Sequence, residues 1–148
     1  MCGFRLGYFH TLDQKLVADV VEMKSHTSMN TSTASQAMGL AAMKERDTYV
    51  AAHLPIWKER RDIIYKGLCD LGLELWKPEG AFYVLPKFKD PTRVMHDLYY
   101  NYDVITYNGT WFGAPKRLRF SYALDASKIE EGLRRVGKFL RKEYLEYP

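Results

Sequence analysis

Two arginines stand in settings that suit the binding of an anion. Arg5 lies between Gly3 and Gly7 in GFRLGY, where glycines let the backbone approach a ligand closely. Arg119 lies in RLRFSYAL, whose alternation predicts a strand, and a charge within a strand requires either water or a buried anion. A guanidinium can bind a carboxylate or a phosphate through two parallel hydrogen bonds. The residues leave a second interpretation open, in which both arginines are simply solvated.

The sequence shows no self-contained catalytic apparatus. The histidines have no partner four residues away and no carboxylates at metal-ligand spacing, so no metal is expected at His10, His26, His53 or His96. A GxSxG elbow, a Walker loop and a GxGxxG motif are all absent from the sequence. Glu130 and Glu131 stand at the start of a predicted helix, where acidic side chains favour the helix dipole.

The composition predicts a globular protein with a hydrophobic core. The chain has 148 residues, of which 47% are hydrophobic and 27% charged, and this excludes wholesale disorder. Cys2 and Cys69 are the only cysteines and form no CxxC pair, so we expect a reducing, cytoplasmic location. No apolar run approaches the roughly 18 residues of a membrane span, and the first residues do not resemble a signal peptide. The net charge of +4 is spread among acids, which argues against nucleic-acid binding.

The first half of the chain is predicted to be helical. Thr11 and Gln14 fit a capping box that begins a helix, whose apolar face comprises Leu12, Leu16, Val17, Val20 and Val21. After the polar stretch SHTSMNTSTASQ comes a short helix, ASQAMGLAAMK, with small residues that allow close packing. A third helix is expected over about 45–71, with a kink or break at Pro55 and a C-terminal stop at Gly72.

The second half predicts a small sheet with helices. LELW and AFYVLPKF predict two strands joined by the turn KPEG, and DVITYNG and RLRFSYAL predict two more. Asp90 and Pro91 begin a short helix between these pairs. Ser127 and Glu130 form a capping box for the last helix, whose apolar face comprises Ile129, Leu133, Val136, Leu140 and Tyr144. This order of elements predicts an α/β or α+β fold with a small sheet covered by helices.

Four segments in this order resemble the C-terminal part of the class I/II aminotransferases, which have fold type I and use pyridoxal 5′-phosphate (PLP). The segments are GFRLGY, SHTSMN with SQAMGLAAM, KPEGAFYVLP, and RLRFSYA with IEEGLRRVGKFL. The resemblance covers essentially the whole chain. It implies that residues 1–45 end the large PLP-binding domain and that residues 46–148 form the small domain. It also implies transfer of an amino group between an amino acid and a 2-oxo acid.

The resemblance implies a role for five residues. Arg5 matches the arginine that binds the cofactor phosphate, and Arg119 matches the arginine that binds the substrate α-carboxylate. Asn30 lies in the segment that reaches the neighbouring subunit's active site, which implies a homodimer. Phe82 and Tyr83 match the turn that lines the substrate pocket, although core packing explains either residue equally well.

The chain departs from the family at two places. The lysine that forms the Schiff base in the family would precede Met1, so we expect this chain to be inactive alone. Tyr107-Asn108-Gly109 stands where the family often has a proline-glycine pair, which leaves the substrate side chain open. Other interpretations are a lyase or decarboxylase of the same fold and a non-catalytic dimerisation or binding module. A weaker one is nucleic-acid binding through basic residues of the last helix, namely Arg134, Arg135, Lys138, Arg141 and Lys142.

Overall fold

The computed structural model describes the backbone of residues 2–146 and the side chains of residues 3–142. Within these limits the chain forms two compact units, which divide between Ala52 and His53. The division falls inside helix α3 (Arg46–Asp70). The assignment of residues 1–45 and 46–148 to a large and a small domain stays a prediction.

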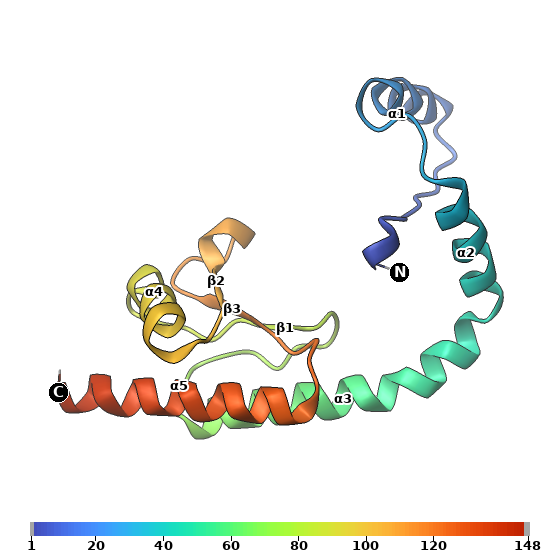
Figure 1. The fold of residues 1–148 in the computed structure, drawn as a ribbon. Helices are drawn as coiled ribbons and strands as arrows, with labels where there is room; N and C mark the ends of the chain where they lie inside the picture. Colours follow the sequence, from blue (N-terminus) through green and yellow to red (C-terminus); the bar gives the residue numbers. More distant parts are fainter. Residues whose placement is uncertain (1, 147–148) are drawn as a thin grey trace. The chain divides into compact units, whose positions relative to one another are not determined.

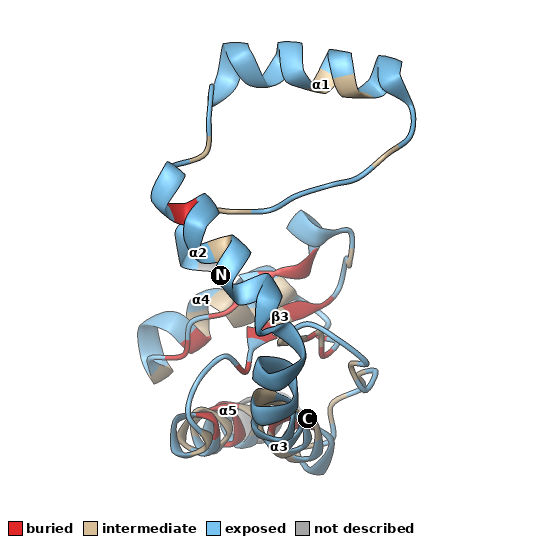
Figure 2. Ribbon diagram, turned by 90° about the vertical axis from the view of Figure 1, so that its right-hand side faces the viewer, coloured by how far each residue is buried: buried red, intermediate tan, exposed pale blue. Residues whose placement is uncertain are grey.

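The first unit begins with a 3-10 helix, η1 (Cys2–Phe4), followed by helix α1 (Gln14–Thr27). The Asp13 carboxylate caps α1, because its Oδ1 accepts hydrogen bonds from the backbone N–H groups of Lys15 and Leu16 at 2.9 and 3.1 Å. The predicted capping box at Thr11 is therefore wrong. The Thr11 hydroxyl oxygen instead accepts a bond from the backbone N–H of Asp13. All side chains of α1 are exposed or half-buried (Figure 2), so the described residues of this unit leave its predicted apolar face largely uncovered.

Helix α2 (Thr33–Lys44) packs against the end of η1 and the residues that follow it. The buried Ser35 hydroxyl donates to the Phe4 carbonyl at 3.1 Å, which joins the two segments. At Gly39 an added Cβ would collide with the Leu6 side chain. The prediction that small residues allow close packing of this helix is therefore confirmed.

Helix α3 runs through Pro55 without interruption, so of the predicted kink or break the break is not found, and the kink stays a prediction. Pro55 is exposed, and water can hydrate the carbonyl that has no N–H partner at this position. The helix ends as predicted at Gly72, which has a φ of 82°. The N–H of Leu73 donates to the Leu68 carbonyl and that of Gly72 to the Cys69 carbonyl, which is the hydrogen-bond pattern of a Schellman motif.

The second unit contains a three-stranded antiparallel sheet with the order β1-β3-β2. The strands are β1 (Tyr83–Val84), β2 (Tyr107–Asn108) and β3 (Leu118–Ser121). Three of the four predicted strands are confirmed in shortened form, whereas LELW is not a strand. Its Glu74 carbonyl accepts one backbone bond, from Lys87 at 2.9 Å, and also accepts from the Arg117 guanidinium, so no ladder continues along this segment.

Helices cover the apolar face of this sheet. Leu118, Phe120 and Tyr122 are buried, as the predicted alternation requires, together with residues of α3, α4 (Pro91–Tyr102) and α5 (Ala126–Glu146) (Figure 1). Helices α3 and α5 pack so closely that a Cβ at Gly67 would meet Leu133. None of the helices in the described part of the chain is long and apolar enough to span a membrane.

Helices α4 and α5, which both begin within the second unit, begin differently from one another. Asp90 caps α4 by accepting a bond from the Arg93 N–H at 3.0 Å, with Pro91 in the first turn as predicted. The predicted capping box of α5 is wrong. This helix begins at Ala126, and the Asp125 carbonyl accepts its first backbone bonds, from Lys128 and Ile129. Among its predicted apolar residues, Tyr144 lies outside the side chains that are described.

Candidate functional site

Arg119 lies on the central strand of the sheet, on the face opposite the core. Tyr107 of β2 pairs directly with Arg119, and Tyr83 of β1 pairs with Ser121, two residues further along β3. Directly opposite and diagonal positions place their side chains on one face of a sheet. The Arg119 guanidinium carbon accordingly lies 5.1 Å from the ring centre of Tyr107 and 4.4 Å from that of Tyr83.

A third ring comes from the short helix η2 (Gly109–Phe112). The Phe112 ring centre lies 3.7 Å from the Arg119 guanidinium carbon. The Asn108 side chain fixes this segment, since its oxygen accepts from the Thr110 N–H and its nitrogen donates to the Thr92 hydroxyl, both at 3.0 Å. We call Tyr83, Tyr107 and Phe112 the aromatic cage.

The turn that carries the cage residue Phe112 depends on glycine. The Gly109 N–H donates to the Arg117 carbonyl at 2.8 Å. A Cβ at Gly109 would lie 2.6 Å from that same carbonyl oxygen and would collide with the carbonyl oxygen of Ala114. Gly113, with a φ of 73°, ends η2. The segment Tyr107-Asn108-Gly109 therefore forms a tight, hydrogen-bonded turn beside Arg119.

The charge of Arg119 is not neutralised by any carboxylate in the described part of the chain. Its buried Nε has no hydrogen-bond partner there. Buried polar groups in folded proteins almost always have a partner, and a guanidinium prefers a bidentate carboxylate or phosphate. The arrangement can therefore bind an organic anion, with the rings as walls and the guanidinium as donor.

Arg117, two residues away, has a structural role that the sequence did not reveal. It is only 7% exposed and donates to the Leu85 carbonyl at 2.7 Å and to the Glu74 carboxylate at 3.1 Å. Its guanidinium also lies 3.7 Å from the ring centre of Trp76. Lys87, followed by Arg117, holds the pKa of Glu74 below its usual value. The two arginines of one strand thus differ in whether the protein satisfies their donors.

Phe82 and Tyr83 point to different surroundings. Tyr83 belongs to the aromatic cage, whereas Phe82 packs against the core and lies 5.9 Å from Trp57 between ring centres. The two adjacent rings are 4.5 Å apart and link the cage to the core. Of the five predicted site residues, the structure brings Tyr83 and Arg119 into direct contact. Sequence reasoning missed Tyr107 and Phe112 as their neighbours, although the alternation of DVITYNG could have placed Tyr107 opposite a strand residue.

Arg5 and Asn30 belong to the first unit. Arg5 is exposed after η1 and itself has a positive φ of 51°, whereas a Cβ at Gly3 or Gly7 would meet nothing within 4 Å. The predicted close approach of the backbone to a ligand at these glycines stays a prediction. Asn30 is exposed in the segment after α1. The donor chemistry of Arg5 fits a phosphate group, since a guanidinium offers several N–H groups to its oxygens.

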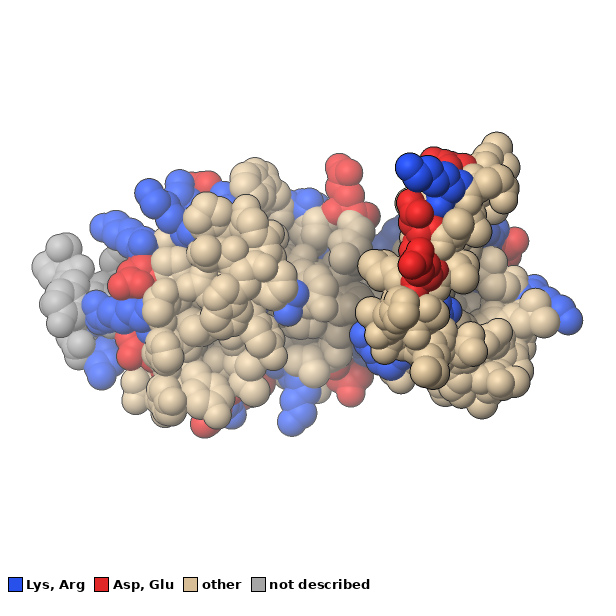
Figure 3. Space-filling view, turned by 90° about the horizontal axis from the view of Figure 1, so that it is seen from above, with Lys and Arg blue, Asp and Glu red and all other residues tan. Residues whose placement is uncertain are grey.

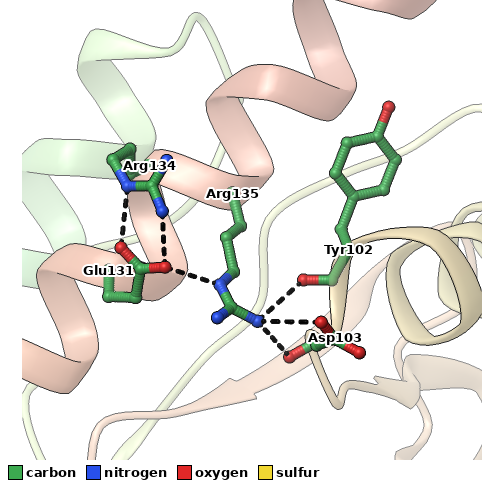
Figure 4. Close-up of polar contacts among 5 residues, drawn as sticks. All are labelled: Tyr102, Asp103, Glu131, Arg134 and Arg135. Atoms are coloured by element: carbon green, nitrogen blue, oxygen red, sulfur yellow. Dashed lines mark hydrogen bonds and ion pairs between the residues drawn. The ribbon is translucent and has the colours of Figure 1, made fainter.

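Arg134 and Arg135, near the middle of α5, are engaged within the second unit. Arg134 and Arg135 both donate to Glu131, at 2.6–2.7 Å, and Arg135 reaches the Tyr102 carbonyl at the end of α4 (Figure 4). Arg134 first, and Arg135 second, lower the pKa of Glu131 to about 2. On the face drawn in Figure 3, acidic and basic side chains are interspersed. This pairing gives no support to a nucleic-acid interface at this part of α5.

The small antiparallel sheet of the second unit thus presents an arginine whose buried Nε has no hydrogen-bond partner in the described part of the chain. The profile of the family "Aminotransferase class I and II" matches residues 1–136. The chain belongs to this family. Members of this class depend on PLP, so the predicted class and cofactor are confirmed.

Curated proteins that are similar to this chain are also named as aminotransferases. An asparagine–oxo-acid transaminase of Streptococcus mutans is 31% identical over 96% of this chain and 38% of its own length. An aspartate aminotransferase of Bacillus sp. YM-2 is 29% identical over 95% of this chain and 38% of its own length. The chain thus spans about two fifths of the length of these relatives.

Solved structures show the same fold. The aspartate aminotransferase of Thermotoga maritima matches with a TM-score of 0.83 and 29% identity, over 95% of this chain and 37% of that one. An aromatic aminotransferase of Pyrococcus horikoshii matches with a TM-score of 0.86 and 26% identity, over 98% and 41%. The predicted fold type I is therefore confirmed.

Proposed function

We propose that this chain supplies the substrate-carboxylate and cofactor-phosphate contacts of an aminotransferase that moves an amino group between an amino acid and a 2-oxo acid. The observation that carries the proposal is Arg119, whose buried Nε has no partner in the described structure. The family match supports it independently. The chain itself spans only about two fifths of its relatives, so we expect turnover only together with the remaining part of such an enzyme.

Arg119 binds and orients the substrate in this proposal. A bidentate pair between its guanidinium and the α-carboxylate fixes the direction of the bonds at Cα. Orientation matters because the Cα–H bond has to align with the cofactor's π system before the proton leaves. When bound, PLP supplies the electron sink for that step. Arg5 binds the phosphate of the cofactor, as a guanidinium suits a phosphate dianion.

A fusion protein tests this proposal. Residues 1–148 are joined to the amino-terminal part of the Thermotoga maritima relative, and formation of 2-oxo acids from each proteinogenic amino acid is measured with 2-oxoglutarate as acceptor. We expect turnover with at least one amino acid. Arg119→Lys should raise the KM for that amino acid about 10- to 100-fold, because it replaces charged hydrogen bonds of roughly 1.5–3 kcal/mol.

The matched control is Arg134→Lys, an exposed substitution on α5, which should leave the KM unchanged. Circular dichroism and PLP binding establish that each fusion is folded. A folded fusion that binds PLP but forms no 2-oxo acid contradicts the proposal. An unchanged KM in the Arg119→Lys fusion contradicts the role assigned to Arg119.

We also propose a homodimer in the cytoplasm, with Asn30 at the interface. The exposed position of Asn30 supports this, as do the uncovered apolar residues of α1, such as Val21 and Met23. Sedimentation velocity of the fusion should give the mass of a dimer. A monomer at micromolar concentration contradicts the assembly.

A further inference from the structure

We propose that Tyr107 and Phe112 are positioning residues, which hold the Arg119 guanidinium in place for a carboxylate without neutralising its charge. This inference deepens the proposed function and rests on it for the identity of the ligand. The geometry of the cage itself is independent of that function. It follows from strand pairing and from the turn after β2.

The rings of Tyr107 and Phe112 are not part of the hydrophobic core. Tyr107 and Phe112 are each 47% exposed, so hydrophobic burial does not by itself account for their placement. Phe112 nevertheless comes within 3.7 Å of the Arg119 guanidinium carbon, measured to the ring centre. Tyr107 also contacts Trp111, with 6.4 Å between ring centres in an edge-to-face arrangement. Both rings are therefore held at the guanidinium while one side of each stays in water.

Aromatic walls have an advantage over acidic ones at such a site. A ring attracts a cation through its quadrupole and forms no hydrogen bond with the N–H groups. A carboxylate wall would occupy those N–H groups and would compete with an incoming carboxylate. Arg117 illustrates the other case, because carbonyl and carboxylate oxygens already occupy its donors. The cage keeps the charge of Arg119 available.

The cage is built on fixed parts of the second unit. The Tyr83 ring forms the inner wall and contacts the tilted ring of Phe82, which packs against the core. The outer walls depend on Asn108, whose side chain is bonded to Thr92 of α4. The guanidinium is therefore positioned by elements that do not need a bound ligand.

NMR of the ¹⁵N-labelled chain of 148 residues tests the positioning directly. Ring currents of the cage residues should displace the Arg119 Hε resonance upfield of the Hε resonances of the other arginines. Phe112→Leu and Tyr107→Leu should each move it back, while Phe112→Tyr and Tyr107→Phe should retain the displacement. Tyr100→Leu, on the exposed face of α4, is the control and should leave it unchanged. If the Hε resonance in both leucine variants is the same as in the wild type, the proposal is overturned.

Binding of sodium propionate, a simple carboxylate probe, tests what the positioning is for. The Arg119 Hε resonance should shift saturably with propionate but not with sodium chloride at equal ionic strength. The dissociation constant should rise at least threefold in Phe112→Leu and stay within twofold of wild type in Phe112→Tyr. If Phe112→Leu moves the Arg119 Hε resonance back but leaves the dissociation constant for propionate unchanged, the positioning role is overturned. No response to propionate in the wild type contradicts the carboxylate role of Arg119 in the proposed function, while the leucine variants still decide the cage.

Discussion

Replacing Arg117 and Arg119 separately by methionine should have opposite consequences for stability and binding. Arg117→Met leaves the Leu85 carbonyl without its donor and removes the contact with Trp76. An unsatisfied buried group costs roughly 1–3 kcal/mol and a cation–π contact contributes about 1 kcal/mol. We therefore expect a loss of about 2–4 kcal/mol in the free energy of unfolding.

Arg119→Met removes three cation–π contacts, each worth roughly 0.5–1 kcal/mol at an exposed site. It also removes the buried Nε that has no partner, whose penalty is roughly 1–3 kcal/mol. The two effects nearly cancel, so the free energy of unfolding should change by less than about 1 kcal/mol. Carboxylate binding should nevertheless be lost.

Urea denaturation followed by tryptophan fluorescence measures both variants. All three tryptophans, at positions 57, 76 and 111, lie in the second unit, so the signal reports that unit alone. The melting temperature should fall by roughly 8–32 °C in Arg117→Met and by less than about 8 °C in Arg119→Met. Equal destabilisation of the two variants would refute the distinction between a structural and a ligand-binding arginine.

Three further predictions concern the framework of the second unit. Gly109→Ala should lower the free energy of unfolding by about 1–3 kcal/mol in urea denaturation, because its Cβ would overlap two carbonyl oxygens. Gly132→Ala, where a Cβ meets nothing within 4 Å, should raise that free energy by about 0.5–1 kcal/mol in the same assay, since alanine favours the helix. Glu131 has a pKa lowered to about 2 by Arg134 and Arg135, so its stabilising contribution is present above the usual 4.5 and is lost as pH falls towards 2. The stability difference between wild type and Glu131→Gln should shrink over that range, and a difference independent of pH would contradict the pairing.

Local sequence signals predicted the structure correctly where a single residue determines the backbone conformation. Gly72 ends α3 as predicted, because its positive φ suits the residue that lacks a Cβ. Helix starts were less predictable, because several polar residues precede each helix and the backbone path selects one. Asp13 rather than Thr11 reaches the free N–H groups of α1, and α5 begins before Ser127. Periodicity likewise cannot show whether an extended segment such as LELW finds a partner along its length.

The candidate site was only half predictable for a related reason. Alternation places Arg117 and Arg119 on the same side of their segment and gives them the same expected surroundings. What separates them comes from distant segments: Arg117 meets Glu74 and the Leu85 carbonyl, and Arg119 meets three aromatic rings. A guanidinium whose donors meet oxygens of its own chain holds segments together. A guanidinium held by rings keeps its donors available, and this difference is the reason why we propose an anion as the partner of Arg119 and not of Arg117.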